Sequence, residues 1–475
     1  MKYSWIIRSV KLRTVLFKLL PLLKLYGLIC LAPVAVSLIY GEYVHTLIFA
    51  VTAVIAFLVG RFFQKDREGS INVPEGLIIT ALSYIMFSLL GALGFLPVTS
   101  FINGFFESMS GFTTTGLTLF DPETLPRTLV FFRSYSQWIG GAGIVILSLA
   151  VLIVPPRSSL RMFLSEGKKD DAIGNIKSLT LLILKVYGTF TVIGAGLFYL
   201  SGMGIFDSVV HVLSCISTGG FSSYGKSLAA YGGVTRISFI LIMFLGAVNF
   251  ASYYLLRKKT GIRKFYAEPQ LRYLLSVIFI SALIYLCFYG WDTQKTLLCL
   301  FHSTSASTTT GFIVSTPGEW PGGVKLLSAL QMIIGGGDGS TAGGIKVFRF
   351  VIIIYLVRWL IRGLLLPRKA KVPLKYADRI IDNESIKRIM GFFALYLMVL
   401  TISTVIISLF GYDPSDSFFE SASSLGTVGL SSGITSMALP PFLKLVLIFN
   451  MWAGRLEILP VLVIFNPFIW RKKEA

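Results

Sequence analysis

The sequence predicts an all-α membrane protein built from four pseudo-repeated units, each a helix, a pore loop and a second helix, around a central pore. Two extra transmembrane helices are expected at the N-terminus. Three observations lead to this prediction: an apolar composition, a ten-residue pattern that occurs four times, and basic residues gathered in alternate loops. Self-similarity at a large spacing is typical of a repeat architecture.

The composition is that of an integral membrane protein. Of the 475 residues, 54% are hydrophobic and only 14% are charged, and the mean hydropathy is +0.76. Soluble domains are far less apolar than this. The four cysteines lie in apolar surroundings without CxxC spacing, so neither a disulfide framework nor a zinc site is indicated.

The ten-residue pattern begins at Glu107, His211, His302 and Glu420. Each copy has Ser at its fourth position, Thr at its eighth and Gly at its tenth, followed by a large apolar residue. Chance does not explain three matched positions in four segments, so four sectors around one axis are expected. The matched residues are Ser110, Ser214, Ser305 and Ser423, then Thr114, Thr218, Thr309 and Thr427, then Gly116, Gly220, Gly311 and Gly429.

Each copy is suited to a half-helix that ends at a short extended segment. Glycine frees the backbone there, so carbonyl oxygens can turn toward a common axis. Rings of such carbonyl oxygens replace the hydration shell of a potassium ion in potassium channels. The segment Thr427-Val428-Gly429 resembles the start of the TVGYG filter of those channels. The alternative, four simple loops between helices, explains one copy better than four in register. The candidate K+-binding residues are Thr114, Thr115, Gly116, Thr218, Gly219, Gly220, Thr309, Thr310, Gly311, Thr427, Val428 and Gly429.

Apolar segments frame each copy, and crossing a bilayer core takes about 20 helical residues. Two segments, 22–40 and 46–60, precede the first copy. The pairs that frame the copies are 73–96 with 126–154, 178–203 with 233–256, 271–290 with 322–364, and 389–411 with 440–469. The expected units are an N-terminal extension at 1–68 and pore repeats at 69–176, 177–266, 267–382 and 383–475.

Basic residues give the expected orientation. Most of the 43 Lys and Arg residues fall in the stretches 1–24, 61–68, 157–177, 257–272, 358–388 and 471–473. The positive-inside rule then predicts that both termini are cytoplasmic and that all four filters enter from outside. The net charge of +20 is therefore explained by topology and requires no nucleic acid. A basic inner face is also expected to attract anionic lipid or an acidic partner.

Two of the leading residues are carboxylates. Glu107 and Glu420 are expected to open half-helices at the outer side, where a carboxylate complements the positive helix N-terminus and raises the local cation concentration. A helix-terminal acid with no role in conduction is the alternative.

A glycine-rich loop, Gly335–Gly344, interrupts the return span of the third repeat. Six glycines in ten residues are incompatible with a stable helix, at about 1 kcal/mol each relative to Ala, so the helix must break. Non-helical backbone at membrane depth has to be buried in protein or line water, which predicts an obstruction below the filter. A phosphate-binding loop is excluded because Ile345 separates Gly344 from Lys346 and Val347 replaces the required Ser or Thr.

One charge lies far inside the last span. Arg455 is expected to face the bundle interior or a water cavity, with Asp338 or the carbonyls of the glycine-rich loop as partners. A purely structural tie between helices is the alternative. Lys346 and Arg349 are expected near the inner mouth, as simple interface anchors.

The four filter segments, the loop GGGDGSTAGGIKVFR and the segment AGRLEILPV resemble the TrkH/KtrB superfamily of potassium-uptake proteins over about residues 70–470. The two N-terminal spans are more similar to TrkH than to the shorter KtrB plan. The resemblance implies a homodimer with one pore per subunit in the bacterial cytoplasmic (inner) membrane, and a TrkA-type cytoplasmic ring that gates it. Nucleotides such as ATP, ADP or NAD would bind only to that partner.

The resemblance also implies an intramembrane gate. Two residues depart from the family pattern: Asp338 stands where a small or apolar residue is usual, and Ala342 replaces a glycine. The implied gate residues are Gly335, Gly336, Gly337, Asp338, Gly339, Ser340, Thr341, Ala342, Gly343, Gly344 and Arg455.

The expected function is channel-like, gated potassium uptake with no covalent chemistry. A secondary transporter that couples potassium to sodium or protons is the alternative, and it would use an intramembrane acid such as Asp338 on the substrate path. A membrane enzyme is disfavoured because the sequence has no cluster of acids, histidines or serine nucleophiles at one depth.

Overall fold

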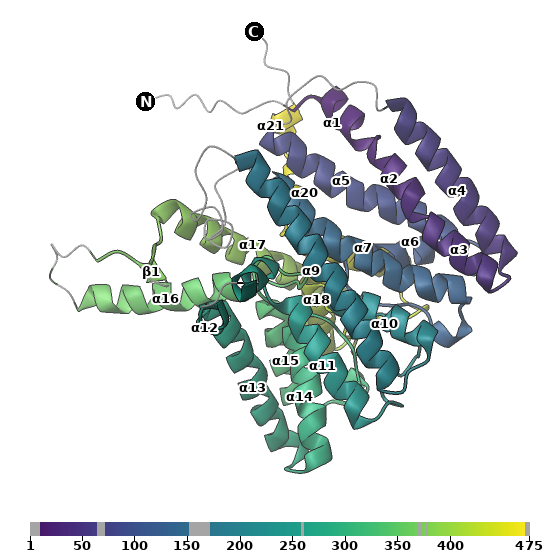
Figure 1. The fold of residues 1–475 in the computed structure, drawn as a ribbon. Helices are drawn as coiled ribbons and strands as arrows, with labels where there is room; N and C mark the ends of the chain where they lie inside the picture. Colours follow the sequence, from purple (N-terminus) through teal and green to yellow (C-terminus); the bar gives the residue numbers. More distant parts are fainter. Residues whose placement is uncertain are drawn as a thin grey trace, which may run out of the picture.

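The computed structural model describes residues 10–63, 72–151, 172–257, 261–365, 367, 372–376 and 379–470. Helices dominate these residues (Figure 1). The strands within them are two residues long: β1 (Lys375–Tyr376) pairs antiparallel with β2 (Arg379–Ile380). The predicted all-α class is confirmed.

The N-terminal extension is a helical hairpin. Its first arm runs through α1 (Leu12–Leu19), α2 (Leu22–Ile29) and α3 (Leu31–Ile39), and its second arm is α4 (Tyr43–Phe62). Pro21 separates α1 from α2, because proline offers no N–H to the helix and restricts the residue before it. A Cβ on Gly27 would lie 2.6 Å from Ala53 O, so glycine allows the two arms to pack closely.

Each following unit places a half-helix between a long first helix and one or two return helices. The units contain α5 (Val73–Ala92), α6 (Phe101–Phe112) and α7 (Arg127–Val151); α9 (Ala172–Leu200), α10 (Ile205–Ile216) and α11 (Gly233–Ala247); α13 (Pro269–Tyr289), α14 (Thr293–Ser307), α15 (Gly322–Ile334) and α16 (Val347–Leu364); and α17 (Asn383–Leu409), α18 (Pro414–Gly426), α19 (Pro441–Arg455) and α20 (Leu459–Ile464). The short helices α12 (Gly261–Tyr266) and α21 (Pro467–Trp470) complete the described set.

Six helical segments among the described residues are long and apolar enough to cross a membrane. They are Leu12–Ile39, Tyr43–Phe62, Val73–Phe95, Thr180–Leu200, Pro269–Tyr289 and Asn383–Leu409. All four half-helices α6, α10, α14 and α18 are shorter than these spans. The multi-pass character predicted from composition is confirmed.

The return spans depart from the prediction in two repeats. The break in the third repeat is present, because α15 ends at Ile334 and α16 begins at Val347. The spans predicted as continuous at 233–256 and 440–469 were wrong, since α11 ends at Ala247 and α19 ends at Arg455.

The backbone conformation changes at both additional breaks. After α11, Val248 is extended and the chain continues as a 3-10 helix over Phe250–Arg257. After α19, Glu457 and Ile458 adopt φ values of 59° and 61°, a conformation that β-branched residues rarely adopt. Pro460 then opens α20, where its missing N–H costs nothing.

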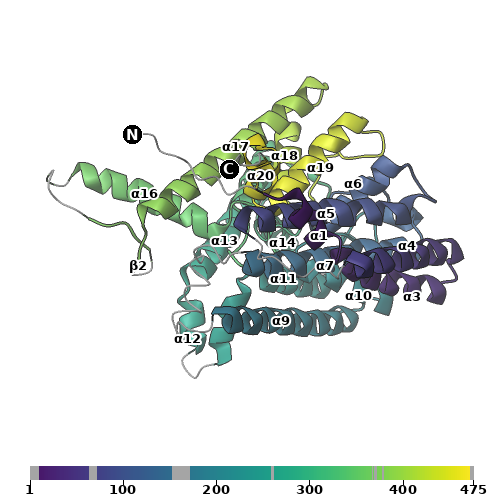
Figure 2. The ribbon, with the colours of Figure 1, turned by 90° about the horizontal axis from the view of Figure 1, so that it is seen from above.

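The N-terminal hairpin and α16 lie at opposite ends of the molecule, and α16 projects away from the body together with β1 and β2 (Figures 1 and 2). The two described ends of the chain are adjacent, since Val10 N donates to Ile469 O at 2.8 Å. The hairpin is also tied to the first repeat: Glu42 caps α7 by accepting from the backbone N–H groups of Arg127 and Thr128 at 2.8 and 2.9 Å.

Three return elements carry a glycine against the end of a half-helix. A Cβ on Gly140 would lie 1.9 Å from Phe112 O, and one on Gly454 would lie 1.9 Å from Leu425 O. The corresponding distance from Gly246 to Ile216 O is 2.6 Å. Only glycine permits this approach, so the return helices support the half-helices at the sixth position of the repeated pattern.

Candidate functional site: a four-sector backbone ring and the loop beneath it

The four copies of the pattern share one unusual backbone shape. Their eighth-position threonines have φ values of 53°, 54°, 54° and 50°, and their tenth-position glycines have 88°, 81°, 84° and 94°. A left-handed β-branched residue is an outlier, and surrounding structure has to impose it. The same strain in Thr114, Thr218, Thr309 and Thr427 indicates a common constraint on the four copies. The glycines with positive φ two residues further on are Gly116, Gly220, Gly311 and Gly429.

The four segments close into a ring. The glycine of each copy lies against the carbonyl oxygen of the ninth-position residue in the next copy, too near for a side chain. An ideal Cβ on Gly116 would lie 2.0 Å from Gly219 O, and one on Gly220 would lie 2.0 Å from Thr310 O. The corresponding distances are 1.9 Å from Gly311 to Val428 O and 2.4 Å from Gly429 to Thr115 O. The ninth and tenth residues of the four copies therefore close into one ring, in which the fourth copy meets the first. Each eighth-position threonine directly precedes this ring in the chain.

The leading residue of every copy binds the chain just beyond the ring, 11 or 12 residues downstream. In the carboxylate copies, Glu107 accepts from Thr118 Oγ1 at 2.7 Å and from Leu119 N at 3.2 Å. Glu420 accepts from Ser431 Oγ at 2.9 Å and from Ser432 N at 3.1 Å. In the histidine copies, Nε2 of His211 lies 2.9 Å from Ser222 Oγ, and Nε2 of His302 accepts from Val314 N at 3.2 Å.

The expected helix-terminal role of the two glutamates is wrong. Glu107 lies in the middle of α6 and Glu420 in the middle of α18, and both are fully buried. Their carboxylates hold the segment that follows the ring, because buried oxygens require donors. The repetition of a polar leading residue was visible in the sequence, but its downstream partner was not.

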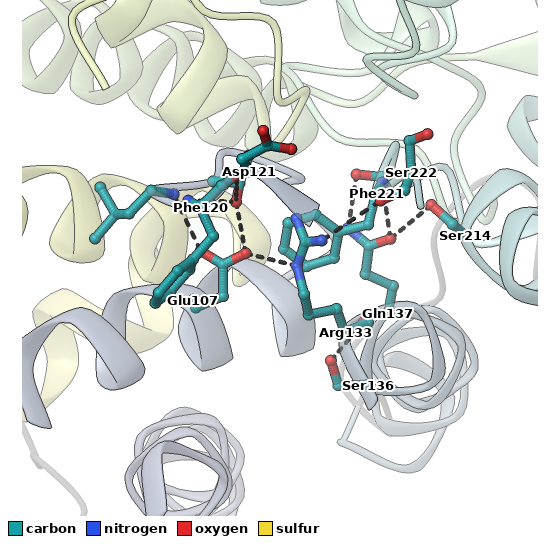
Figure 3. A network of polar contacts seen from close by, with 12 residues as sticks. Glu107, Phe120, Asp121, Arg133, Ser136, Gln137, Ser214, Phe221 and Ser222 are labelled. Atoms are coloured by element: carbon teal, nitrogen blue, oxygen red, sulfur yellow. Dashed lines mark hydrogen bonds and ion pairs between the residues drawn. The ribbon is translucent and has the colours of Figure 1, made fainter. Parts of the chain in front are cut away.

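Arg133 was missed as a site residue, because it lies outside the repeated pattern, in the expected return span 126–154. Its side chain is 1% exposed, and its Nε forms an ion pair with Glu107 Oε1 at 2.7 Å. It also donates to Ser222 O at 3.4 Å and lies 4.1 Å from the centroid of the Phe221 ring. Figure 3 shows Arg133 between Glu107 of the first repeat and residues of the second.

The glycine-rich loop contacts two of the eighth-position threonines. Gly343 N donates to Thr309 Oγ1 at 2.7 Å, and Thr218 Oγ1 donates to Thr341 Oγ1 at 3.3 Å. A Cβ on Gly343 would lie 2.0 Å from Gly426 O, which explains a glycine at this position.

The first half of the loop contacts other elements. Gly337 N donates to Ala247 O, and Asp338 N donates to Gln270 Oε1, both at 2.9 Å. Gly339 O accepts from Phe250 N at 3.2 Å, at the start of the 3-10 helix that follows α11. The break in the second return span and the loop of the third repeat therefore support each other.

Arg455 ties the loop to the first repeat. It donates to Thr341 O at 2.6 Å and to Gly140 O at 3.0 Å, and it is 5% exposed. The predicted interior position and the pairing with a loop carbonyl are confirmed.

Lys346 and Arg349 are not simple interface anchors. Lys346 is buried and donates through Nζ to Ala342 O within the loop. Arg349 forms an ion pair with Glu457 at 2.5 Å and lies over the Phe392 ring. Both residues connect the end of the loop to neighbouring structure.

Comparisons with known proteins place this architecture in a family. The family model TrkH, described as a cation transport protein, matches residues 45–291 and 291–472. The chain belongs to the TrkH family.

Relatives match nearly the whole length of this chain. An uncharacterized cation transporter of Methanocaldococcus jannaschii is 32% identical, covering 94% of this chain and 93% of that protein. The Trk system potassium uptake protein TrkH of Salmonella typhimurium is 29% identical, covering 93% of this chain and 95% of that protein. The crystal structure of the potassium transporter TrkH from Vibrio parahaemolyticus superposes with a TM-score of 0.84 at 26% identity, covering 97% and 100% of the two chains.

Proposed function

We propose that this chain is a gated, potassium-selective pore for ion uptake across the cytoplasmic membrane. Twelve residues in or directly before the ring, Thr114–Gly116, Thr218–Gly220, Thr309–Gly311 and Thr427–Gly429, form its selectivity filter. The observation that carries the proposal is the closed ring, in which each glycine lies against a carbonyl of the next repeat. Backbone oxygens in such a ring can replace the water shell of a cation. Potassium as the ion is supported by the names of the bacterial relatives.

The loop Gly335–Gly344 and Arg455 form the gate in this proposal. The contacts of Gly343 and Thr341 with two eighth-position threonines support a position directly below the filter. Arg455 holds the loop there through Thr341 O. Opening would require the loop to leave this position, since its backbone fills the space beneath Thr218 and Thr309.

The assembly and orientation belong to the same proposal. Both termini face the cytoplasm, which the distribution of basic residues supports. Two copies form a homodimer in the lipid bilayer, and a TrkA-type nucleotide-binding ring regulates the gate from the cytoplasmic side. The working units are the extension 1–68 and four pore repeats at 69–176, 177–266, 267–382 and 383–475. An inside-negative potential favours potassium entry by about 2.3 kcal/mol per 100 mV.

The test compares potassium and sodium flux into liposomes that contain the purified protein or Gly429→Ser. A side chain at Gly429 would collide with Thr115 O in the ring. We expect potassium-selective flux in the wild type and lost selectivity in the variant. The matched control is Gly433→Ser, because Gly433 also has a positive φ, of 106°, yet no atom lies within 4 Å of its Cβ position. Equal sodium and potassium flux that Gly429→Ser leaves unchanged would overturn the filter.

One observation favours a second candidate, coupling of potassium to sodium or protons. Asp338 is an acid in the loop and is 3% exposed. Coupled transport predicts a current that reverses away from the potassium equilibrium potential, and Asp338→Asn should restore reversal at that potential. Reversal at the potassium potential in the wild type would eliminate the coupled mechanism.

A further inference from the structure

One repeat of the ring differs from the other three. At the ninth position, Thr115, Thr310 and Val428 carry side chains, but the second repeat has Gly219. The Gly219 carbonyl is nevertheless a member of the ring, since it lies against Gly116. Glycine has the largest conformational freedom of any residue, so this carbonyl needs support from outside its own segment.

The support comes from Gln137 on α7, in the preceding repeat. Its Nε2 donates to Gly219 O at 2.7 Å, and it is fully buried. A Cβ on Gly219 would lie 2.3 Å from Gln137 Cδ. The amide therefore occupies the space in which the other ninth-position residues place their own side chains.

The orientation of this amide follows from its neighbours. Oε1 accepts from Phe221 N at 3.3 Å and from Ser214 Oγ at 2.7 Å. A backbone N–H can only donate, so the atom facing it is the oxygen and the atom facing Gly219 O is the nitrogen. Figure 3 shows Gln137 directed from its helix toward Ser214 and Phe221 of the second repeat.

The other repeats carry a different residue at this position. The position compared lies three residues before a glycine of each return element, namely Gly140, Gly246, Gly335 and Gly454. It holds Gln137 in the first repeat and methionine in the other three, at Met243, Met332 and Met451. All four side chains are fully buried. The amide thus occurs in the one repeat whose neighbour in the ring lacks a ninth-position side chain.

We propose that Gln137 is a positioning residue for ion selectivity, which fixes the Gly219 carbonyl in the ring by a hydrogen bond and by filling the missing side-chain volume. This inference rests on the proposed filter and extends it. The ring must keep its radius to prefer potassium over the smaller sodium ion. The N–H of Gln137 restrains Gly219 O from moving inward, and it already engages one lone pair of that oxygen, so the four carbonyls are not equivalent.

The first test is Gln137→Met, which installs the residue of the other repeats and removes the donor. We expect the potassium-to-sodium permeability ratio in liposomes to fall roughly fivefold or more, in line with the loss of one hydrogen bond of about 1 kcal/mol. The matched control is Ser136→Ala, whose hydroxyl donates to Arg133 O within its own helix. A purely structural role for Gln137 would lower the amount of folded protein and reduce both fluxes together, leaving the ratio unchanged.

The second test is a double-mutant cycle with Gly219→Ala. Alone, Gly219→Ala collides with the amide and should reduce selectivity, whereas in the Gln137→Ala background the new methyl has room and should recover part of it. Equal effects of Gly219→Ala in both backgrounds would overturn the proposed pairing.

Gly429→Ser, measured alongside, separates this inference from the proposed function. One outcome would overturn only the role of Gln137: a selective wild type, a Gly429→Ser variant that has lost selectivity, and a Gln137→Met variant that keeps the wild-type permeability ratio. A wild type without preference for potassium would overturn both.

Discussion

Arg455 donates to the carbonyl oxygen of Thr341 at 2.6 Å, although 114 residues separate the two in the chain. The arginine ends α19 of the last repeat, and the threonine lies in the loop of the third repeat, beside Thr218 of the second. The second contact of Arg455, with Gly140 O, adds the first repeat. One buried guanidinium therefore joins the loop to the helices that surround it.

Arg455→Met should release the loop and raise potassium flux. Hydrogen bonds to a charged group contribute about 1.5–3 kcal/mol each, so losing the bond that holds the loop at Thr341 O should raise the open population by about tenfold or more. The measurement is potassium flux per folded protein in liposomes. Lys444→Met is the matched control, since Lys444 is also buried on α19 but lies near its other end. Flux at or below the wild-type value in Arg455→Met would contradict a restraining role.

Glu107→Gln should destabilise the fold. The substitution leaves the Arg133 charge buried without its carboxylate, and breaking such a pair costs about 3–5 kcal/mol. The midpoint of thermal unfolding in detergent should fall clearly. Lys325→Gln is the comparison, because it breaks the Lys325–Asp416 pair at 2.9 Å, whose side chains are 14% and 30% exposed, and an exposed pair is worth about 1 kcal/mol or less. Equal shifts in the two variants would show that burial does not govern the Glu107 pair.

The repeated pattern identified the ring residues because the constraint is local. A left-handed eighth residue and a tenth residue pressed against a neighbouring carbonyl restrict residue type at fixed spacing, and four copies make that restriction visible. The break at Gly335 was predictable for a similar reason, since six glycines in ten residues exclude a helix from composition alone.

Features that depend on a distant partner could not be predicted in this way. The sequence marks Glu107 as repeated but does not reveal that Arg133 and Leu119 surround it. The end of α11 at Ala247 depends on the loop of another repeat, through Gly337 and Phe250. Pro460 was the one local signal for the end of α19, whereas the positive φ of Ile458 is set by its surroundings.

His302→Leu should weaken selectivity, and His302→Gln should retain it. The histidine accepts from Val314 N through Nε2, and this bond holds the chain just beyond Gly311. Leucine leaves the partly buried Val314 N–H without this acceptor, at a cost of about 1 kcal/mol, whereas the Oε1 of glutamine can accept in its place. The potassium-to-sodium permeability ratio of the two variants measures the difference. Identical ratios in Leu and Gln variants would show that this hydrogen bond does not shape the ring.

Gly140→Ala should prevent the first half-helix from reaching its position. The methyl would lie 1.9 Å from Phe112 O, and because backbone atoms form that contact, no side-chain rotation can relieve it. Overpacking of this kind costs about 1–3 kcal/mol or more. The displaced helix α6 carries Glu107, and its end leads directly to Thr114. We therefore expect a lower unfolding midpoint together with a reduced permeability ratio. Gly188→Ala on α9 is the matched control, since its Cβ position has no atom within 4 Å and alanine favours a helix by about 1 kcal/mol over glycine. A Gly140→Ala protein with wild-type stability and selectivity would show that close packing against Phe112 does not position the ring.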